Sequence, residues 1–171
     1  MTVLRRAQKG EPLVTAENVP PEVLEWLIDN GWSPGRDIGS KADDLVALRV
    51  RTSEEQGSTL PPVPAAARII HSYGLLRLPH PRVQSYAWIM DPTVTYKGDT
   101  ENIRELAESL GTSLFPVGYE SSEAGFILVD ATGRFFLLHH TGGYFLGFDE
   151  HDAFKRFLNN VSAPDAEDFF V

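Results

Sequence analysis

The sequence predicts an α+β fold: a single domain in which helices flank one mostly antiparallel sheet. Its 171 residues suit one domain and are too few for two domains of ordinary size. Apolar side chains recur at helical spacing in residues 21–73, whereas residues 113–146 hold short apolar runs separated by glycine-containing turns. Helices first and a meander of strands afterwards are typical of the α+β class.

The domain is expected to span residues 20–161, after a flexible lead-in over residues 1–19. Pro20-Pro21 favours a helix start, because proline in a first turn loses no intrahelical hydrogen bond. Gly31 suits the left-handed conformation that ends many helices, and Ser40 is predicted to cap a second helix. The elements predicted in this half are helices over 21–30, 40–55 and 63–73 and a short strand over 75–78.

The second half is predicted to be a meander closed by a helix. Gly133 and the Gly142-Gly143 pair indicate two tight hairpin turns, and Thr100 is the expected cap of a helix. The predicted elements are strands over 85–90, 113–119, 125–130, 134–140 and 144–146 and helices over 99–110 and 149–160. Residues 162–171 form an acidic tail, and we expect Phe169 and Phe170 at its end to dock on the domain.

Composition limits the classes of function. The chain has no cysteine, which removes disulfides, thiolate nucleophiles and cysteine-bound zinc and fits a reducing compartment. Its net charge is −9, so it repels phosphate backbones and we expect no nucleic-acid partner. No apolar run is long enough for a secretory signal or a membrane span. The sequence therefore predicts a cytoplasmic protein without a membrane partner.

Acidic residues are concentrated in two stretches. Residues 99–130 hold seven acids against one base, and residues 149–171 hold six acids against two bases. Such surfaces attract basic proteins and raise their association rates ~10-fold or more. A basic protein partner is one interpretation of this pattern, and a well-solvated surface without a partner is the other.

Three linear motifs of common enzymes are absent from the sequence. It has no Gly-x-Ser-x-Gly nucleophile turn, no Gly-x-x-x-x-Gly-Lys-Ser/Thr phosphate loop and no His-Glu-x-x-His zinc site. We therefore expect neither catalysis nor a cofactor.

Three polar groups are candidate metal or acid–base sites: the His139-His140 pair, the cluster Asp149-Glu150-His151-Asp152, and Glu120 with Glu123. Neighbouring side chains on a strand point to opposite faces, so the two histidines are not expected to share a metal. Asp149 suits a helix N-cap, and the serine-rich segment over 120–123 indicates a solvated loop. No metal is predicted, and a small metal-dependent hydrolase that uses His139 or the acidic cluster remains an alternative.

Four segments, in the same order along the chain, resemble the third SUKH family over residues 21–160. They are NGWSPGR at 30–36, LAESLGTSLFPVG at 106–118, DATGR at 130–134, and Leu146-Gly147 with the helix that follows. The stretch from Ser53 to Pro81 departs from the family pattern by its extra prolines.

The resemblance implies a SUKH-like α+β domain and, as in many bacterial members, an immunity protein. Such proteins bind and neutralise a toxin, often a nuclease or nucleic-acid deaminase of a polymorphic toxin system, and have no catalytic residues to carry over. We therefore expect a non-enzymatic protein that occludes a toxin with a basic surface. A general SUKH-type interaction or regulatory module is the alternative. The candidate partner-binding residues are Glu120, Glu123, Asp165, Glu167 and Asp168.

Overall fold

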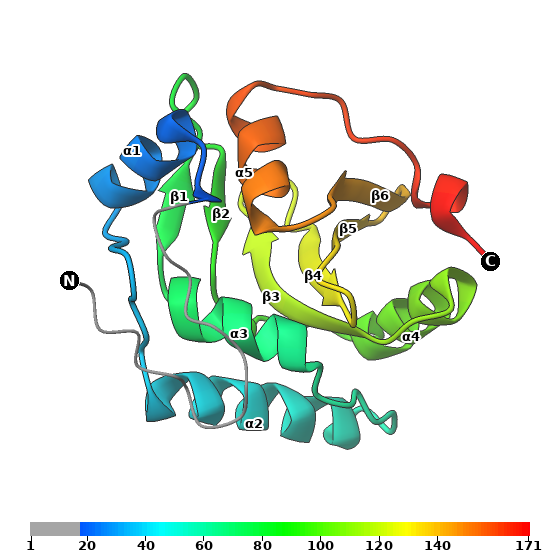
Figure 1. Cartoon of the computed structure of the whole chain (residues 1–171). Helices are drawn as coiled ribbons and strands as arrows, with labels where there is room; N and C mark the ends of the chain where they lie inside the picture. Colours follow the sequence, from blue (N-terminus) through cyan, green and yellow to red (C-terminus); the bar gives the residue numbers. More distant parts are fainter. Residues whose placement is uncertain (1–17) are drawn as a thin grey trace.

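Six strands form one antiparallel sheet in the computed structural model of the protein, which describes residues 18–171 (Figure 1). Their order in the sheet is their order in the chain, so every strand pairs with the next one along the sequence. The strands are β1 (Arg77–Pro79), β2 (Ala87–Ile89), β3 (Leu114–Glu120), β4 (Phe126–Asp130), β5 (Phe135–His139) and β6 (Gly142–Gly147). Of the predicted lead-in over 1–19, residues 1–17 lie outside the described residues.

Helices cover both faces of this sheet, and the predicted α+β single domain is confirmed. They are α1 (Pro21–Asp29), α2 (Ser40–Glu55), α3 (Pro64–Tyr73), α4 (Asp99–Leu110), α5 (Glu150–Leu158) and a short 3-10 helix, η2 (Ala166–Phe169). Each of the five predicted helices is present within two residues of its expected ends. The helix η2 lies in the tail, where no element was predicted.

Two predicted caps and the predicted bounds of two strands are wrong, and the caps and the first strand have causes in the local backbone. Ser40 and Thr100 lie within the first turns of their helices, and Gly39 and Gly98 occupy the cap positions with φ of 63° and 85°. Glycine adopts such angles without the steric cost that a side chain adds. The first strand starts later than predicted, because Leu75 has a φ of 67° and cannot extend it. The second strand is shorter than predicted at both ends.

Neighbouring phenylalanines on β5 show how the two faces of the sheet are divided. Phe135 contacts the rings of Trp88 and Phe154, whereas Phe136 contacts the rings of Phe145 and Phe169. Consecutive side chains of a strand point to opposite faces. One face therefore packs against α5, which carries Phe154, and the other against the tail.

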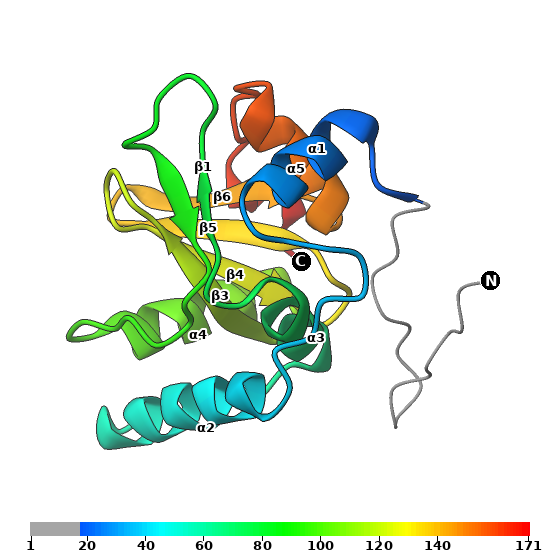
Figure 2. The same cartoon turned by 90° about the vertical axis from the view of Figure 1, so that its left-hand side faces the viewer.

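The first face is closed by an aromatic cluster that joins α1, α3, α5 and β2. The buried ring of Phe154 lies 5.6 Å from that of Trp26, 5.1 Å from that of Tyr73 and 5.8 Å from that of Trp88, measured between centroids. Rings in such tilted and edge-on pairs contribute beyond the area that they bury. Figure 2 shows α3 between the sheet and α2.

The second face is covered by α4 and the tail, which meet over Gly143 of β6. A β-carbon at this glycine would lie 3.0 Å from Leu106 of α4 and 3.2 Å from Ala166 of η2. The glycine therefore lets both elements approach the strand closely. Figure 1 shows the C-terminal end beside α4, where the backbone N–H of Val171 donates to the carbonyl of Ser109.

A buried ion pair connects α2 with the start of α4. Arg49 and Asp99 are fully buried, and their nearest nitrogen and oxygen are 3.5 Å apart. The same carboxylate oxygen accepts a hydrogen bond from the backbone N–H of Tyr96. Burial lowers the pKa of Arg49, and the charge of Asp99 partly opposes this shift. Asp99 thus fixes the segment that enters α4.

A second polar contact holds α3 against the start of α2. The two ring nitrogens of His71 lie 2.6 Å from a carboxylate oxygen of Asp37 and 2.9 Å from one of Asp43. Partial burial alone would lower the pKa of His71, but the two carboxylates outweigh it and the pKa lies above its ordinary value. Folding therefore favours the imidazolium form of His71 relative to the unfolded chain.

Replacing Phe154 by alanine should destabilise the fold strongly, because the ring is fully buried among the rings of several elements. We expect a loss of about 3–5 kcal/mol in the free energy of unfolding, measured by urea denaturation. The matched control is Phe148→Ala, since this ring is 57% exposed. A similar loss in both variants would contradict the assignment of Phe154 to the core.

The His71 contact should make stability depend on pH. Because the folded pKa is raised above the unfolded value of 6.5, the contact stabilises fully below that value. Its contribution is lost as the pH rises from 6.5 through the folded pKa. Unfolding measured across this range should show the wild type losing its advantage over His71→Gln. A constant difference between the two proteins would contradict the ion pairs.

Candidate functional site

A hollow on the second face lies between α4, the β5–β6 turn and the tail, and we call it the α4 groove. Its volume is about 490 Å³. The lining residues are Tyr96, Asp99, Asn102, Glu105, Leu106, Ser109, Phe126, Leu138, His139, His140, Thr141, Gly142 and Phe170. None of these described residues is a lysine or an arginine. The groove therefore combines aromatic and apolar surface with acidic side chains.

Helix α4 forms one wall of the groove. Asn102, Glu105 and Ser109 follow one another at spacings of three and four residues, which places them on one face of the helix. Leu106 shares this face and is buried against the sheet, so the polar residues lie at the exposed border of the same helix face. The helix thus presents a carboxylate to the groove beside an apolar floor.

Tyr96 forms the aromatic end of the groove. Its ring stacks on that of Phe126 with centroids 4.8 Å apart, and 47% of the residue is exposed. Its backbone N–H donates to the carboxylate of Asp99 over 2.9 Å. Partial burial and the charge of Asp99 raise the pKa of its hydroxyl, which stays protonated at neutral pH. The ring is therefore held in place with one face open.

The β5–β6 turn forms the opposite wall of the groove. Its geometry shows that the prediction of opposite directions for the side chains of His139 and His140 is wrong. The rings of His139 and His140 do not point to opposite sides, because β5 ends at His139 and His140 belongs to the turn. Their centroids lie 3.9 Å apart. The Nδ1 atom of His139 contacts the hydroxyl of Thr141, which contacts that of Tyr144 over 2.6 Å.

The tail closes the groove at its outer end. Phe169 stacks on Phe145 with centroids 4.2 Å apart, so its predicted docking is confirmed. Phe170 lines the groove but stays 42% exposed. The backbone N–H of Phe145 donates to the carbonyl of Pro164, and an isolated bridge joins Asp165 to Tyr144. The tail therefore covers part of the open edge of β6.

The predicted partner-binding residues divide into two groups. Glu120 is buried and accepts hydrogen bonds from the backbone of Ser122 and Glu123, so the expectation of a solvated side chain is wrong for this residue. It is the last residue of β3 and stabilises the turn after the strand. Glu123 is exposed and its Oε2 lies 2.6 Å from Nε2 of His139, which lines the groove.

The three acidic residues of the tail, Asp165, Glu167 and Asp168, are exposed. They lie on η2 or directly before it, and η2 contacts α4. The fold thus brings them to the same side of the molecule as the acidic wall of α4. Their role in binding stays a prediction. Tyr96 and Asn102 were not anticipated, although the polar spacing on α4 was readable in the sequence.

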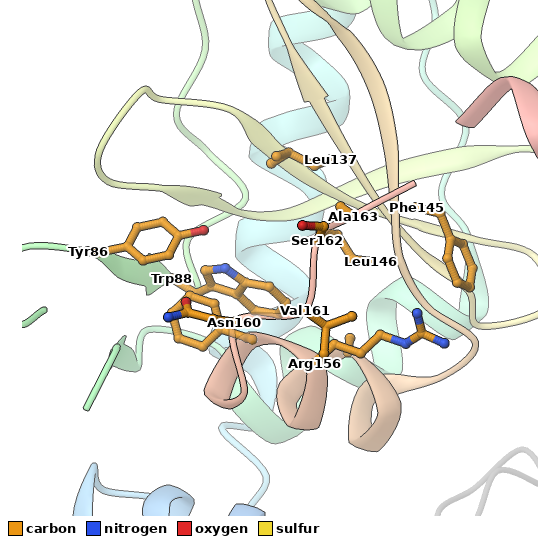
Figure 3. A pocket seen from close by; sticks show the side chains of 12 residues that line it. Tyr86, Trp88, Leu137, Phe145, Leu146, Arg156, Asn160, Val161, Ser162 and Ala163 are labelled. Carbon is orange, nitrogen blue, oxygen red and sulfur yellow. The ribbon is translucent and has the colours of Figure 1, made fainter. Parts of the chain in front are cut away.

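A smaller hollow of about 170 Å³ lies on the first face, between α5 and the sheet (Figure 3). Leu137 lines it, whereas the next residue, Leu138, lines the α4 groove. Figure 3 shows Tyr86 and Trp88 on one side and Arg156 on the other. None of the described residues that line it is acidic, so this hollow does not suit a basic partner as the α4 groove does.

The acidic cluster at the start of α5 has structural partners. Asp149 accepts a hydrogen bond from the backbone of Asp152, which confirms it as the N-cap. Glu150 binds Arg68 through two hydrogen bonds of 2.8 and 3.0 Å. Burial alone would raise the pKa of Glu150, but Arg68 holds it below its ordinary value. Among residues 18–171, no three histidine or carboxylate side chains converge as metal ligands.

Replacing Phe169 by alanine should release the tail, because this ring anchors it on Phe145. The backbone N–H groups of Phe145 and Val171, which bond to Pro164 and Ser109, should then exchange with solvent at least ~10-fold faster. Hydrogen-exchange NMR measures both. The matched variant Phe170→Ala should leave these rates close to those of the wild type. Unchanged rates in Phe169→Ala would show that the tail is held by other contacts.

Comparison with known proteins supports the resemblance inferred from the sequence. The model of one family, described as SUKH-3 immunity protein, matches residues 19–160. A search of curated proteins and a search of solved structures found no significant match. Among residues 18–171, no helix has the length and apolar character needed to cross a membrane. Because the matched segment covers well over half of this chain, the chain belongs to the SUKH-3 immunity protein family.

Proposed function

We propose that the protein neutralises a cognate bacterial toxin by binding a basic face of it with the α4 groove and the acidic residues around it. Membership of an immunity protein family is the observation that carries this proposal. The toxin is inferred to be an enzyme that acts on nucleic acid, such as a nuclease or a deaminase. Such enzymes need a basic face for their substrate, and an acidic protein that covers this face blocks them.

The pairing of charges supports the choice of this surface. Asp130 and Asp152 each bind an arginine of the same chain. By contrast, Glu105, Glu167 and Asp168 have no ion pair with any described residue and are exposed. A cation from a partner gains more from unpaired carboxylates than from neutralised ones. The exposed rings of Tyr96 and Phe170 add the kind of apolar contact that anchors protein interfaces.

Neutralisation by occlusion needs no chemistry in the protein itself, and we infer a non-enzymatic role in the cytoplasm. The alternative of a general interaction or regulatory module predicts a partner unrelated to toxins. The identity of the neighbouring gene separates these two, since an immunity gene accompanies its toxin gene. A metal-dependent hydrolase predicts stoichiometric zinc or manganese in the purified protein, which metal analysis measures.

Reversing three acids should abolish protection from the toxin. The variant Glu123→Lys/Glu167→Lys/Asp168→Lys carries lysines on exposed positions beside the groove. We expect its affinity for the toxin encoded by the adjacent gene to fall ~10-fold or more at low salt, because the attraction becomes repulsion. The measurements are calorimetry and survival of cells that express both proteins.

The control for this experiment has the same change of charge on the other side of the fold. It is Glu25→Lys/Asp29→Lys/Asp44→Lys, whose positions are exposed on α1 and in the first turns of α2. This variant should bind and protect almost as the wild type does. Equal losses in both variants would show that only net charge matters. An affinity that does not change with salt would reject the electrostatic part, and no binding at low salt would reject the proposed function.

A further inference from the structure

We propose that the α4 groove is a receptor for one arginine side chain that protrudes from the partner's surface. This inference rests on the proposed function for the identity of the partner, but the groove's preference for arginine is testable without any toxin. It deepens the proposed function by naming the group that the groove recognises. The protein binds two of its own arginines on neighbouring surfaces in the same way.

Arg134 shows the first example. Its Nε donates to the carboxylate of Asp130 over 2.7 Å, and its guanidinium carbon lies 5.4 Å from the ring centre of Phe136 and 5.9 Å from that of Phe169. One carboxylate and two rings thus surround one guanidinium group. A guanidinium plane suits this environment because it stacks on rings while its edge donates hydrogen bonds.

Arg156 repeats the arrangement with other residues. Its Nε donates to the carboxylate of Asp152 over 3.0 Å. The guanidinium carbon lies 5.4 Å from the ring centre of Phe145 and 5.9 Å from that of Phe148. Both arginines therefore combine a carboxylate with two aromatic rings at the end of the molecule that carries the tail.

The α4 groove also combines a carboxylate with two aromatic rings, but none of its described residues supplies a guanidinium group. The exposed rings of Tyr96 and Phe170 and the carboxylate of Glu105 line it together, and no described lining residue is a lysine or arginine. The other lining carboxylate, Asp99, is buried and lies 3.5 Å from Arg49, so its charge is already compensated. A groove lined by one uncompensated carboxylate and two exposed rings fits a cation from outside the chain.

Arginine fits better than lysine for a geometric reason. The ring of Tyr96 is fixed by its stacking on Phe126 and by the hydrogen bond of its backbone to Asp99. A fixed ring offers a flat surface, on which a planar guanidinium stacks and a tetrahedral ammonium does not. The hydroxyl of Ser109 and the amide of Asn102 provide acceptors on the same wall for the remaining N–H groups.

The test uses the full chain and three short peptides, acetyl-Gly-Arg-Gly-amide and its lysine and citrulline analogues. Citrulline keeps the shape of arginine but has no charge. Titration is followed by two-dimensional NMR of the isotope-labelled protein. We expect saturable shifts with the arginine peptide at Tyr96, Glu105, Ser109 and Phe170, at least ~3-fold weaker binding of lysine, and none of citrulline.

Two matched variants locate the site. Glu105→Gln should weaken binding of the arginine peptide at least ~3-fold, since it removes the charge and keeps the size. Glu25→Gln, an exposed position on α1, should leave binding unchanged. The proposal would be overturned if shifts of equal size appeared over α1 and α2 or if the titration did not saturate. It would also be overturned if the lysine peptide bound equally well, or if Glu105→Gln kept the affinity of the wild type for the arginine peptide.

The outcomes also separate this inference from the proposed function. If the protein bound the arginine peptide but not the toxin, the groove would still be an arginine receptor. The proposed neutralisation of a toxin through this surface would then be rejected. Toxin binding that survives Glu105→Gln, together with no response to the arginine peptide, would leave the immunity role standing and reject the receptor.

Discussion

The fold depends on a sheet whose centre is apolar on both faces. The run from Phe135 to Leu138 on β5 alternates between the two sides, so each face exposes large side chains that must be removed from water. One face is covered by helices α1, α3 and α5 and their rings. Among residues 18–171, the other face is covered by α4 and the short tail. The α4 groove lies where this thinner cover leaves the sheet incompletely enclosed.

Much of the fold followed from local patterns, because periodicity and turn residues act over a few positions. The helices and the four long strands were placed well for this reason. The wrong strand start at residue 75 has a local cause, the left-handed backbone of Leu75, which the residue type does not indicate. Glu120 was misjudged because its burial depends on the turn that folds back on it. The groove was not predicted, since its three walls come from segments far apart along the chain.

The family match covers most of the proposed recognition surface but not the tail that closes it. The matched segment ends at residue 160, whereas the tail that closes the groove begins after it. The shared part supplies the sheet and helices on which the groove is built. The tail adds Phe170 and the acids Glu167 and Asp168 to its border. In the proposed function, the part of the chain that matches the family is thus completed by a short segment outside the match.

The buried pair of Arg49 and Asp99 constrains how the sequence of this protein can drift. Losing either member alone strands a charge in the interior, which is costly, whereas exchanging both for apolar residues of similar volume is tolerated in many proteins. The two positions are therefore expected to be inherited as a unit. Since Asp99 also sets the backbone of Tyr96, a lineage that abandons the pair must rebuild the entrance of α4 at the same time.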